Sequence, residues 1–173
     1  MREPVGFRDY VEANQAALRR RAVLLTGDPD TAEDLVQTAL MRVWPHWNRI
    51  DAAHGAYIAT TMTRTFLSWR GRRWHGEAPT AELPERESTA DPYAAADLRD
   101  QLARLLPGLP ARQRATVVLR FYDDLTEAQT AEALGCSVGT VKSQTSRAIT
   151  RLRAALAADA EPGAAATDLR DTP

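Results

Sequence analysis

Cysteine and histidine are scarce in this sequence. The single cysteine, Cys136, excludes an internal disulfide and a cysteine-based zinc site. The three histidines, His46, His54 and His75, are spaced too irregularly for a helical metal site. No nucleophile–base motif surrounds Cys136, which we expect to be a small packing residue rather than a redox sensor. These absences argue against an enzyme, and we expect no catalytic residue, no metal and no cofactor.

Long apolar runs and strand patterns are missing as well. No apolar run approaches ~18 residues, the usual threshold for a membrane span, and no segment is typical of a signal peptide. We therefore expect a cytoplasmic protein without membrane insertion. Alternating strand patterns are hard to find and no internal repeat is present, so the predicted fold class is all-α.

The net charge of −1, from 22 Lys+Arg and 23 Asp+Glu, is unusual for a DNA-binding protein, but the charges are unevenly distributed along the chain. Residues 56–75 carry four arginines and no acid, and residues 76–92 carry one cation and five acids. Residues 93–157 carry nine cations and six acids, and residues 158–173 carry one cation and four acids. Binding to nucleic acid should therefore be local to the two basic segments and weak for the free chain.

The most informative stretch runs from Leu125 to Leu156. Thr126 and Gln129 form a capping box that opens a short helix, and Gly135 suits the position just past its end. Ser137 can cap a second helix. The apolar face of that helix recurs at steps of three and four and consists of Val138, Val141, Thr145, Ala148, Leu152 and Leu156.

The other face of the second helix is small, polar and basic. From Val138 to Leu156 the chain has four cations and no acid. The outward residues are Thr140, Lys142, Ser143, Ser146, Arg147 and Arg151. Two helices joined by a tight glycine turn predict a helix-turn-helix, whose hydroxyl and guanidinium groups would face a DNA major groove. An ordinary helix hairpin with a solvated basic face is the alternative, and capping, turn and charge segregation together favour DNA binding.

The first part of the chain predicts three helices. Residues 6–26 form the first, which Gly27-Asp28-Pro29 breaks. Asp30 and Glu33 resemble another capping box, and the helix they open has the apolar stripe Ala32, Leu35, Val36, Ala39, Leu40, Val43 and Trp47. The polar residues off this stripe are Asp34, Gln37, Thr38 and Arg42.

The third helix, residues 53–74, ends in tryptophans interleaved with arginines. We expect its buried residues to be Ile58, Thr61, Met62, Thr65 and Trp69. The run Trp69-Arg70-Gly71-Arg72-Arg73-Trp74 suits single-stranded nucleic acid, where rings stack on bases and cations follow the backbone. A helix with core tryptophans and solvated arginines is an equal alternative on the residues alone.

The remainder of the chain divides into a linker, two more helices and a tail. Residues 76–92 have the composition of a flexible acidic linker. Helices are predicted over residues 93–106 and 111–122, separated by a proline-glycine turn, with Val117, Val118 and Phe121 facing inward in the second. We expect residues 158–173 to be a disordered tail.

Three stretches, in this order, resemble bacterial sigma factors of the small two-domain extracytoplasmic-function (ECF) group. They are residues 28–44 (DPDTAEDLVQTALMRVW), 57–74 (YIATTMTRTFLSWRGRRW) and 109–153, which ends in the helix-turn-helix. The SWRGRRW and GCSVGTVKSQTSRA runs are most similar to the actinobacterial SigE-like branch. The resemblance implies a sigma-2-like domain at residues 5–75 and a sigma-4-like domain at residues 93–157, joined by the acidic linker.

The resemblance further implies a transcription initiation factor that binds the clamp and flap of core RNA polymerase and directs it to promoter DNA, with an anti-sigma factor as a further partner. The implied polymerase-binding residues are Asp34, Leu35, Gln37, Thr38 and Arg42. The residues implied to recognise and melt the −10 element are Arg64, Trp69, Arg70, Arg72, Arg73 and Trp74. The −35 element would be recognised by the outward helix-turn-helix residues Thr140, Lys142, Ser143, Ser146, Arg147 and Arg151.

Two residues depart from the family pattern. Thr38 stands where the family often has Glu, which bears on the affinity for the clamp. Arg64 stands where the family commonly has Asn, which leaves open the identity of the −10 base contacts.

Two alternative functions remain. A response-regulator-type activator uses a similar helix-turn-helix, but its receiver domain needs a parallel sheet and a phosphorylatable Asp, whereas residues 1–75 predict helices. A helical module that sequesters a partner protein would explain residues 1–55 but leave the cation-only recognition face without a role.

Overall fold

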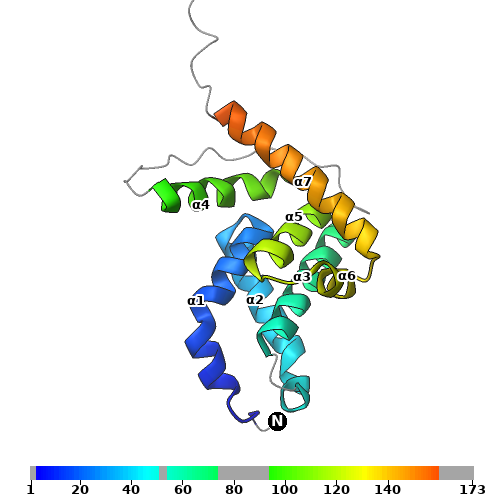
Figure 1. Cartoon of the computed structure of the whole chain (residues 1–173). Helices are drawn as coiled ribbons and strands as arrows, with labels where there is room; N and C mark the ends of the chain where they lie inside the picture. Colours follow the sequence, from blue (N-terminus) through cyan, green and yellow to red (C-terminus); the bar gives the residue numbers. More distant parts are fainter. Residues whose placement is uncertain (1–2, 51–53, 74–93, 160–173) are drawn as a thin grey trace, which may run out of the picture.

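The protein is described from a computed structural model, which describes residues 3–50, 54–73 and 94–159. Within these ranges the chain is all-α and contains no strand, as predicted (Figure 1). The first half comprises α1 (Phe7–Thr26), α2 (Pro29–Val43), the 3₁₀ turn η1 (Trp44–Arg49) and α3 (His54–Arg73). The second half comprises α4 (Ala94–Leu105), η2 (Leu106–Gly108), α5 (Ala111–Val117), the π turn η3 (Val118–Tyr122), α6 (Glu127–Leu134) and α7 (Val138–Asp159).

The linker and the tail fall largely outside the described residues. All of the predicted acidic linker, residues 76–92, lies outside them, and so does the tail from residue 160 onward. The first two residues of the predicted tail belong instead to α7, which continues to Asp159.

The turn between α1 and α2 corrects one predicted cap. The predicted capping box of Asp30 and Glu33 is wrong, because α2 begins earlier, at Pro29. Asp28 is the N-cap, and its carboxylate accepts a hydrogen bond from the backbone N–H of Thr31 at 2.7 Å. Asp28 followed by proline is a better start signal than Asp30, because proline lacks the N–H that the first helical turn leaves unsatisfied.

The core of the first half follows the predicted apolar stripes. The stripe of α2 faces inward, with Ala32, Leu35, Ala39, Val43 and Trp47 buried. The α3 residues Ile58, Met62 and Thr65 are buried as predicted, whereas Thr61 and Trp69 are only half-buried. The rings of Phe7 and Trp47 meet edge to face at 5.0 Å between centroids, which fixes the start of α1 against η1.

The π turn η3 changes which residues face inward after α5. Val118 is buried as predicted and Val117 is half-buried, but Phe121, also predicted to face inward, is 56% exposed. The backbone widens here, with the Asp123 N–H donating to the Val118 carbonyl and the Leu125 N–H donating to the Leu119 carbonyl. A wider turn shifts the helical phase, so a count in steps of three and four misplaces the ring.

The helix-turn-helix is α6, a turn at Gly135 and α7. Both hydrogen bonds of the predicted Thr126–Gln129 capping box are present, and Gly135 adopts a left-handed φ of 62°. The Ser137 hydroxyl caps α7 by accepting from the Thr140 N–H at 3.1 Å. Val141, Ala148 and Leu152 are buried as predicted. Val138, predicted to face inward, is 39% exposed because it occupies the first position of α7, at the end of the helix.

The two halves pack against each other, which the sequence did not predict. Ala115 and Val118 of the second half are fully buried in the same apolar cluster as Leu18, Leu25 and Phe66 of the first. α3 contacts both α5 and α6 (Figure 1), and by residue contacts α1 meets η2 and η3. We call this packing the closed arrangement. It places the helix-turn-helix directly beside α3.

Candidate nucleic-acid and polymerase interfaces

The outward face of α7 presents hydroxyl groups and cations to solvent. Ser143, Ser146, Arg147 and Arg151 are exposed. Within the described part of the chain, neither Arg147 nor Arg151 forms a hydrogen bond or an ion pair. Their guanidinium groups are therefore available as paired donors, the geometry that matches a guanine edge or a phosphate.

The amino-terminal end of this face is less free. The Lys142 ammonium lies 3.7 Å from the Glu127 carboxylate of α6, and the two side chains are 65% and 40% exposed. Thr140 is half-buried, and its hydroxyl lies 2.9 Å from that of Ser137. An exposed ion pair of this kind is weak and would be exchanged readily for a phosphate contact.

The predicted −10 residues of α3 are divided among three environments. Arg64, although exposed, donates from Nε to the Ala133 carbonyl at 2.7 Å and from Nη2 to the Glu132 carbonyl at 3.0 Å, both at the end of α6. Trp69 is half-buried, and Arg70 is exposed with its guanidinium 5.9 Å from the Phe66 ring centroid. Arg72 and Arg73 end α3 with side chains outside the described residues, where Trp74 also lies.

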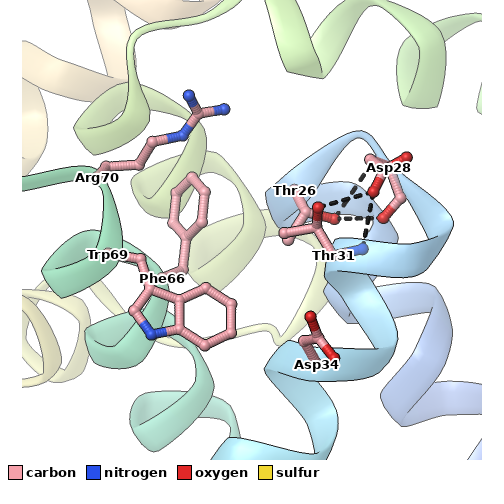
Figure 2. Close-up of a pocket in the computed structure, with 7 residues that line it drawn as sticks. All are labelled: Thr26, Asp28, Thr31, Asp34, Phe66, Trp69 and Arg70. Carbon is pink, nitrogen blue, oxygen red and sulfur yellow. Dashed lines mark hydrogen bonds between the residues drawn. The ribbon is translucent and has the colours of Figure 1, made fainter. Parts of the chain in front are cut away.

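A cavity of about 390 Å³ connects α3 with the start of α2. Figure 2 shows Phe66, Trp69 and Arg70 of α3 on one side, facing Thr26, Asp28 and Thr31 of the α1–α2 turn, with Asp34 below them. The cavity thus brings residues of the predicted −10 surface and Asp34 of the predicted polymerase-binding surface to one place.

The predicted polymerase-binding residues of α2 share one side of the helix only in part. Asp34 and Gln37 are exposed, and the Gln37 amide donates to the Glu33 carboxylate at 3.4 Å. Thr38 is half-buried, and Arg42 donates to the Thr65 hydroxyl of α3 at 2.9 Å. Leu35 is fully buried. It therefore positions α2 from within and cannot itself contact a partner.

Sequence reasoning missed the polar contacts between the halves. Arg114 is 3% exposed, and it donates to the Leu25 carbonyl of α1 at 2.7 Å and to the carbonyls of Pro107 and Leu109. Burial, and then the nearby charge of Arg70, lowers the pKa of Arg114 to about 10. A signal was available, because Arg114 precedes Val118 by one helical turn and so lies on the face predicted to be inward.

A second missed contact is the ion pair of Arg21 on α1 with Asp123, which follows η3. Its side chains are only 13% and 3% exposed. Burial raises the pKa of the Asp123 carboxyl, an effect that the hydrogen bond and charge of Arg21 oppose and that Asp124 reinforces. The sequence gives no sign of this pair, since its members are 102 residues apart.

Neither a metal centre nor a membrane span emerges from the part of the chain that the structure describes. No group of three or more His, Cys, Asp or Glu side chains in that part could hold a metal ion. None of the described helices combines the length and the apolar character that crossing a bilayer requires.

Comparison with known proteins identifies both halves. The sigma-70 region 2 family matches residues 10–76, and the sigma-70 region 4 family matches residues 99–152. The chain is 41% identical over 160 residues to the RNA polymerase sigma-E factor of Streptomyces coelicolor, covering 91% of this chain and 90% of that protein. It is 36% identical over 161 residues to the ECF RNA polymerase sigma factor SigL of Mycobacterium tuberculosis, covering 89% of this chain and 90% of that protein.

A solved structure has a similar fold. The sigma factor RpoE from Bartonella quintana, crystallised in complex with the anti-sigma factor NepR, aligns with a TM-score of 0.64 and 29% identity. The alignment covers 88% of this chain and 98% of that one.

Proposed function

The chain belongs to the ECF RNA polymerase sigma factors of the sigma-70 family. We propose that α2 binds the polymerase, that α3 recognises the −10 element and that α7 recognises the −35 element. The chain is a transcription initiation factor that binds core RNA polymerase and directs it to specific promoters. Sigma factors are not catalysts in themselves, and we assign no reaction to this chain. It acts on the polymerase in the cytoplasm.

We assign −35 recognition to the outward face of α7. The exposure of this face is the observation that carries the proposal. Among its outward residues Thr140, Lys142, Ser143, Ser146, Arg147 and Arg151, the arginines have no competing partner within the described chain. Ser143, Ser146 and Arg147 lie in the first half of the helix, the part that a helix-turn-helix presents to base edges. Arg151 lies one turn farther along, where it would meet phosphate.

We assign −10 recognition and melting to the carboxyl-terminal half of α3. Trp69 and Arg70 lie there on the rim of the cavity, followed by Arg72, Arg73 and Trp74. A half-buried indole next to cations suits an unpaired base, because ring stacking tolerates any base and the cations follow the backbone. Arg64 belongs to this set only if its contact with α6 is released.

Binding to the polymerase clamp is assigned to Asp34 and Gln37, with Thr38 and Arg42 beside them and Leu35 as their support from the core. We further propose that the clamp-binding and −10 surfaces belong to one module, residues 5–75. The −35 surface belongs to a second module, residues 93–157, which binds the flap of the polymerase. The acidic segment 76–92 would then pass through a basic channel of the polymerase.

An anti-sigma factor has a suitable docking surface in the groove between the halves. The groove, of about 1350 Å³, is lined mainly by apolar side chains of α1, α4, η3 and α7, including Leu24, Phe121 and Leu152, with Arg19, Arg20 and Arg153 around it. Three arginines against one acid, Asp100, favour an amphipathic helix with acidic flanks. We propose such a helix as the inhibitory partner, by analogy with the relative crystallised with NepR.

Run-off transcription with purified core polymerase on a genomic library tests the proposed function. We expect transcripts that start at a defined set of promoters sharing −35 and −10 sequences. Starts no more selective than those of core polymerase alone would contradict it. The response-regulator alternative does not fit the fold, because the described residues of the first half form α1, α2, η1 and α3 and contain no strand for a receiver domain.

A further inference from the structure

Arg64 makes the most unusual contact between the two halves. Its guanidinium, on α3, donates to two of the last four carbonyls of α6, those of Glu132 and Ala133, at 3.0 and 2.7 Å. The carbonyl end of a helix is short of donors and carries partial negative charge, so a planar cation is a suitable cap for it. A residue of the proposed −10 surface thus closes the first helix of the −35 module.

The promoter geometry is incompatible with this contact. The position numbers that name the −35 and −10 elements put them about 25 base pairs apart, which is about 85 Å along B-DNA at about 3.4 Å per base pair. In the closed arrangement α3 and α6 are in direct contact. One chain cannot touch both elements in this arrangement, and the Arg64 guanidinium cannot serve α6 and DNA at the same time.

From these observations we propose that Arg64 is an interdomain latch, which holds the −10 surface on the helix-turn-helix in the free chain and is released when the chain engages polymerase and promoter. The proposal rests on the assigned −10 and −35 roles. It also gives a function to a departure from the family pattern, because the Asn commonly found here has a side chain too short to span from α3 to α6 with two donors.

Arg64 is the part of the interface that can be altered without loss of the fold. The apolar contacts of Val118 and the hydrogen bonds of Arg114 are buried, whereas Arg64 is exposed. Removing the charge-assisted bonds should therefore increase the open population by about tenfold and leave both halves folded. A larger open population also raises the apparent affinity for polymerase, because a larger fraction of the molecules is in the state that can bind.

Spin-label distance measurements on the full chain test the latch. Labels at Met41→Cys on α2 and Ala154→Cys on α7, both exposed positions, report the separation of the halves in a Cys136→Ser background. We expect one narrow distance for the free chain, and about ten times more of a longer distance for both Arg64→Ala and Arg64→Asn. Arg49→Ala, which removes an exposed arginine from η1, is the matched control and should keep the narrow distance. On addition of core polymerase and promoter, the unsubstituted chain and Arg49→Ala should both give the long distance.

Three results would overturn the latch. They are a long distance in the free unsubstituted chain, an Arg64→Ala or Arg64→Asn distribution equal to that of Arg49→Ala, and a narrow distance that persists in transcribing complexes. Circular dichroism of each variant shows whether the helices are retained. Run-off transcription judges the proposed function separately, since a factor could transcribe without a latch, and a latched chain could fail to transcribe.

Discussion

Gly27 and Pro107 are in such close contact that a Cβ atom at Gly27 would lie 2.7 Å from Cγ of Pro107. Gly27 ends α1 with a left-handed φ of 77°, and Pro107 belongs to η2 in the other half of the molecule. Only a residue without a side chain allows the two halves to meet at this distance. The closed arrangement therefore depends on a residue whose local role is to end a helix.

Gly27→Ala should destabilise the chain by about 2–3 kcal/mol, the sum of left-handed backbone strain and the clash with Pro107. Gly135→Ala is the matched control, because Gly135 also ends a helix with positive φ, 62°, but a Cβ there would meet nothing within 4 Å. It should cost only about 1 kcal/mol, from strain alone. Urea unfolding measures both, and equal losses would show that the contact with Pro107 contributes nothing.

Asp34→Ala combined with Gln37→Ala should leave the helical content unchanged and weaken binding to core polymerase. Both side chains are exposed and take no part in the core. Glu33→Ala removes a neighbouring carboxylate from the same helix and should have a smaller effect. A pull-down titration measures the affinity, and an unchanged value for the double variant would refute the assignment of the clamp surface.

Arg72→Ala combined with Arg73→Ala should impair transcription from duplex promoters more than from templates mismatched across the −10 region. A mismatch removes the cost of opening the strands, so part of the loss should be restored. Initiation rates on the two templates provide the measurement. Equal losses on both would point to simple electrostatic attraction.

Arg147→Ala should relax the base preference at one or two −35 positions, because a lost bidentate guanine contact costs about 1–3 kcal/mol at that base pair. Arg151→Ala should weaken all sequences alike and reduce the salt slope by about 0.9, as expected for one phosphate contact. Selection of −35 variants with each holoenzyme tests both. If Arg151→Ala shifts the selected sequence and Arg147→Ala does not, the register of α7 in the groove is wrong.

Asp123 should make the free energy of unfolding depend on pH, in a direction that follows from the shift of its pKa. Burial raises the pKa of its carboxyl above the ordinary value near 4, against the opposing effect of Arg21 and with the support of Asp124. The folded chain then binds this proton more readily than the unfolded chain does. The contribution of Asp123 to the free energy of unfolding therefore falls as the pH rises through the interval above about 4.

Asp123→Asn removes that contribution. The unfolding free energy of the variant minus that of the unsubstituted chain should accordingly be more positive at pH 7 than at pH 4. Urea titrations at both pH values give the difference. A change in the opposite direction would mean that the ion pair with Arg21 outweighs the burial of the carboxylate.

The sequence was sufficient for features whose cause is local. The capping box of Thr126 and Gln129, the glycine after α6 and the apolar stripe of α2 each depend on residues within a few positions of one another. The exposed side of α7 follows from the same periodicity. Errors arose where two local signals competed, as at Asp28 and Asp30, or where the helical repeat changed, as at Phe121.

The closed arrangement could not be predicted in this way. Its polar contacts join residues 68 to 105 positions apart, and several of them end on backbone carbonyls, which any sequence provides. Arg64 could be placed on an outward face of α3, but nothing in the sequence specifies that this face meets α6. Likewise, the pattern of α5 places Arg114 inward without naming its acceptor, the Leu25 carbonyl.

The buried Arg114 also bears on how the free protein denatures. Its guanidinium lies 5.7 Å from the Phe66 ring centroid and donates to carbonyls of both halves. If one half lost its structure, Arg114 would lose an acceptor and the apolar surface of Val118 would be uncovered. Two modules that act tens of ångströms apart on a promoter thus form, in the free chain, a single cooperative folding unit, which should melt in one calorimetric transition.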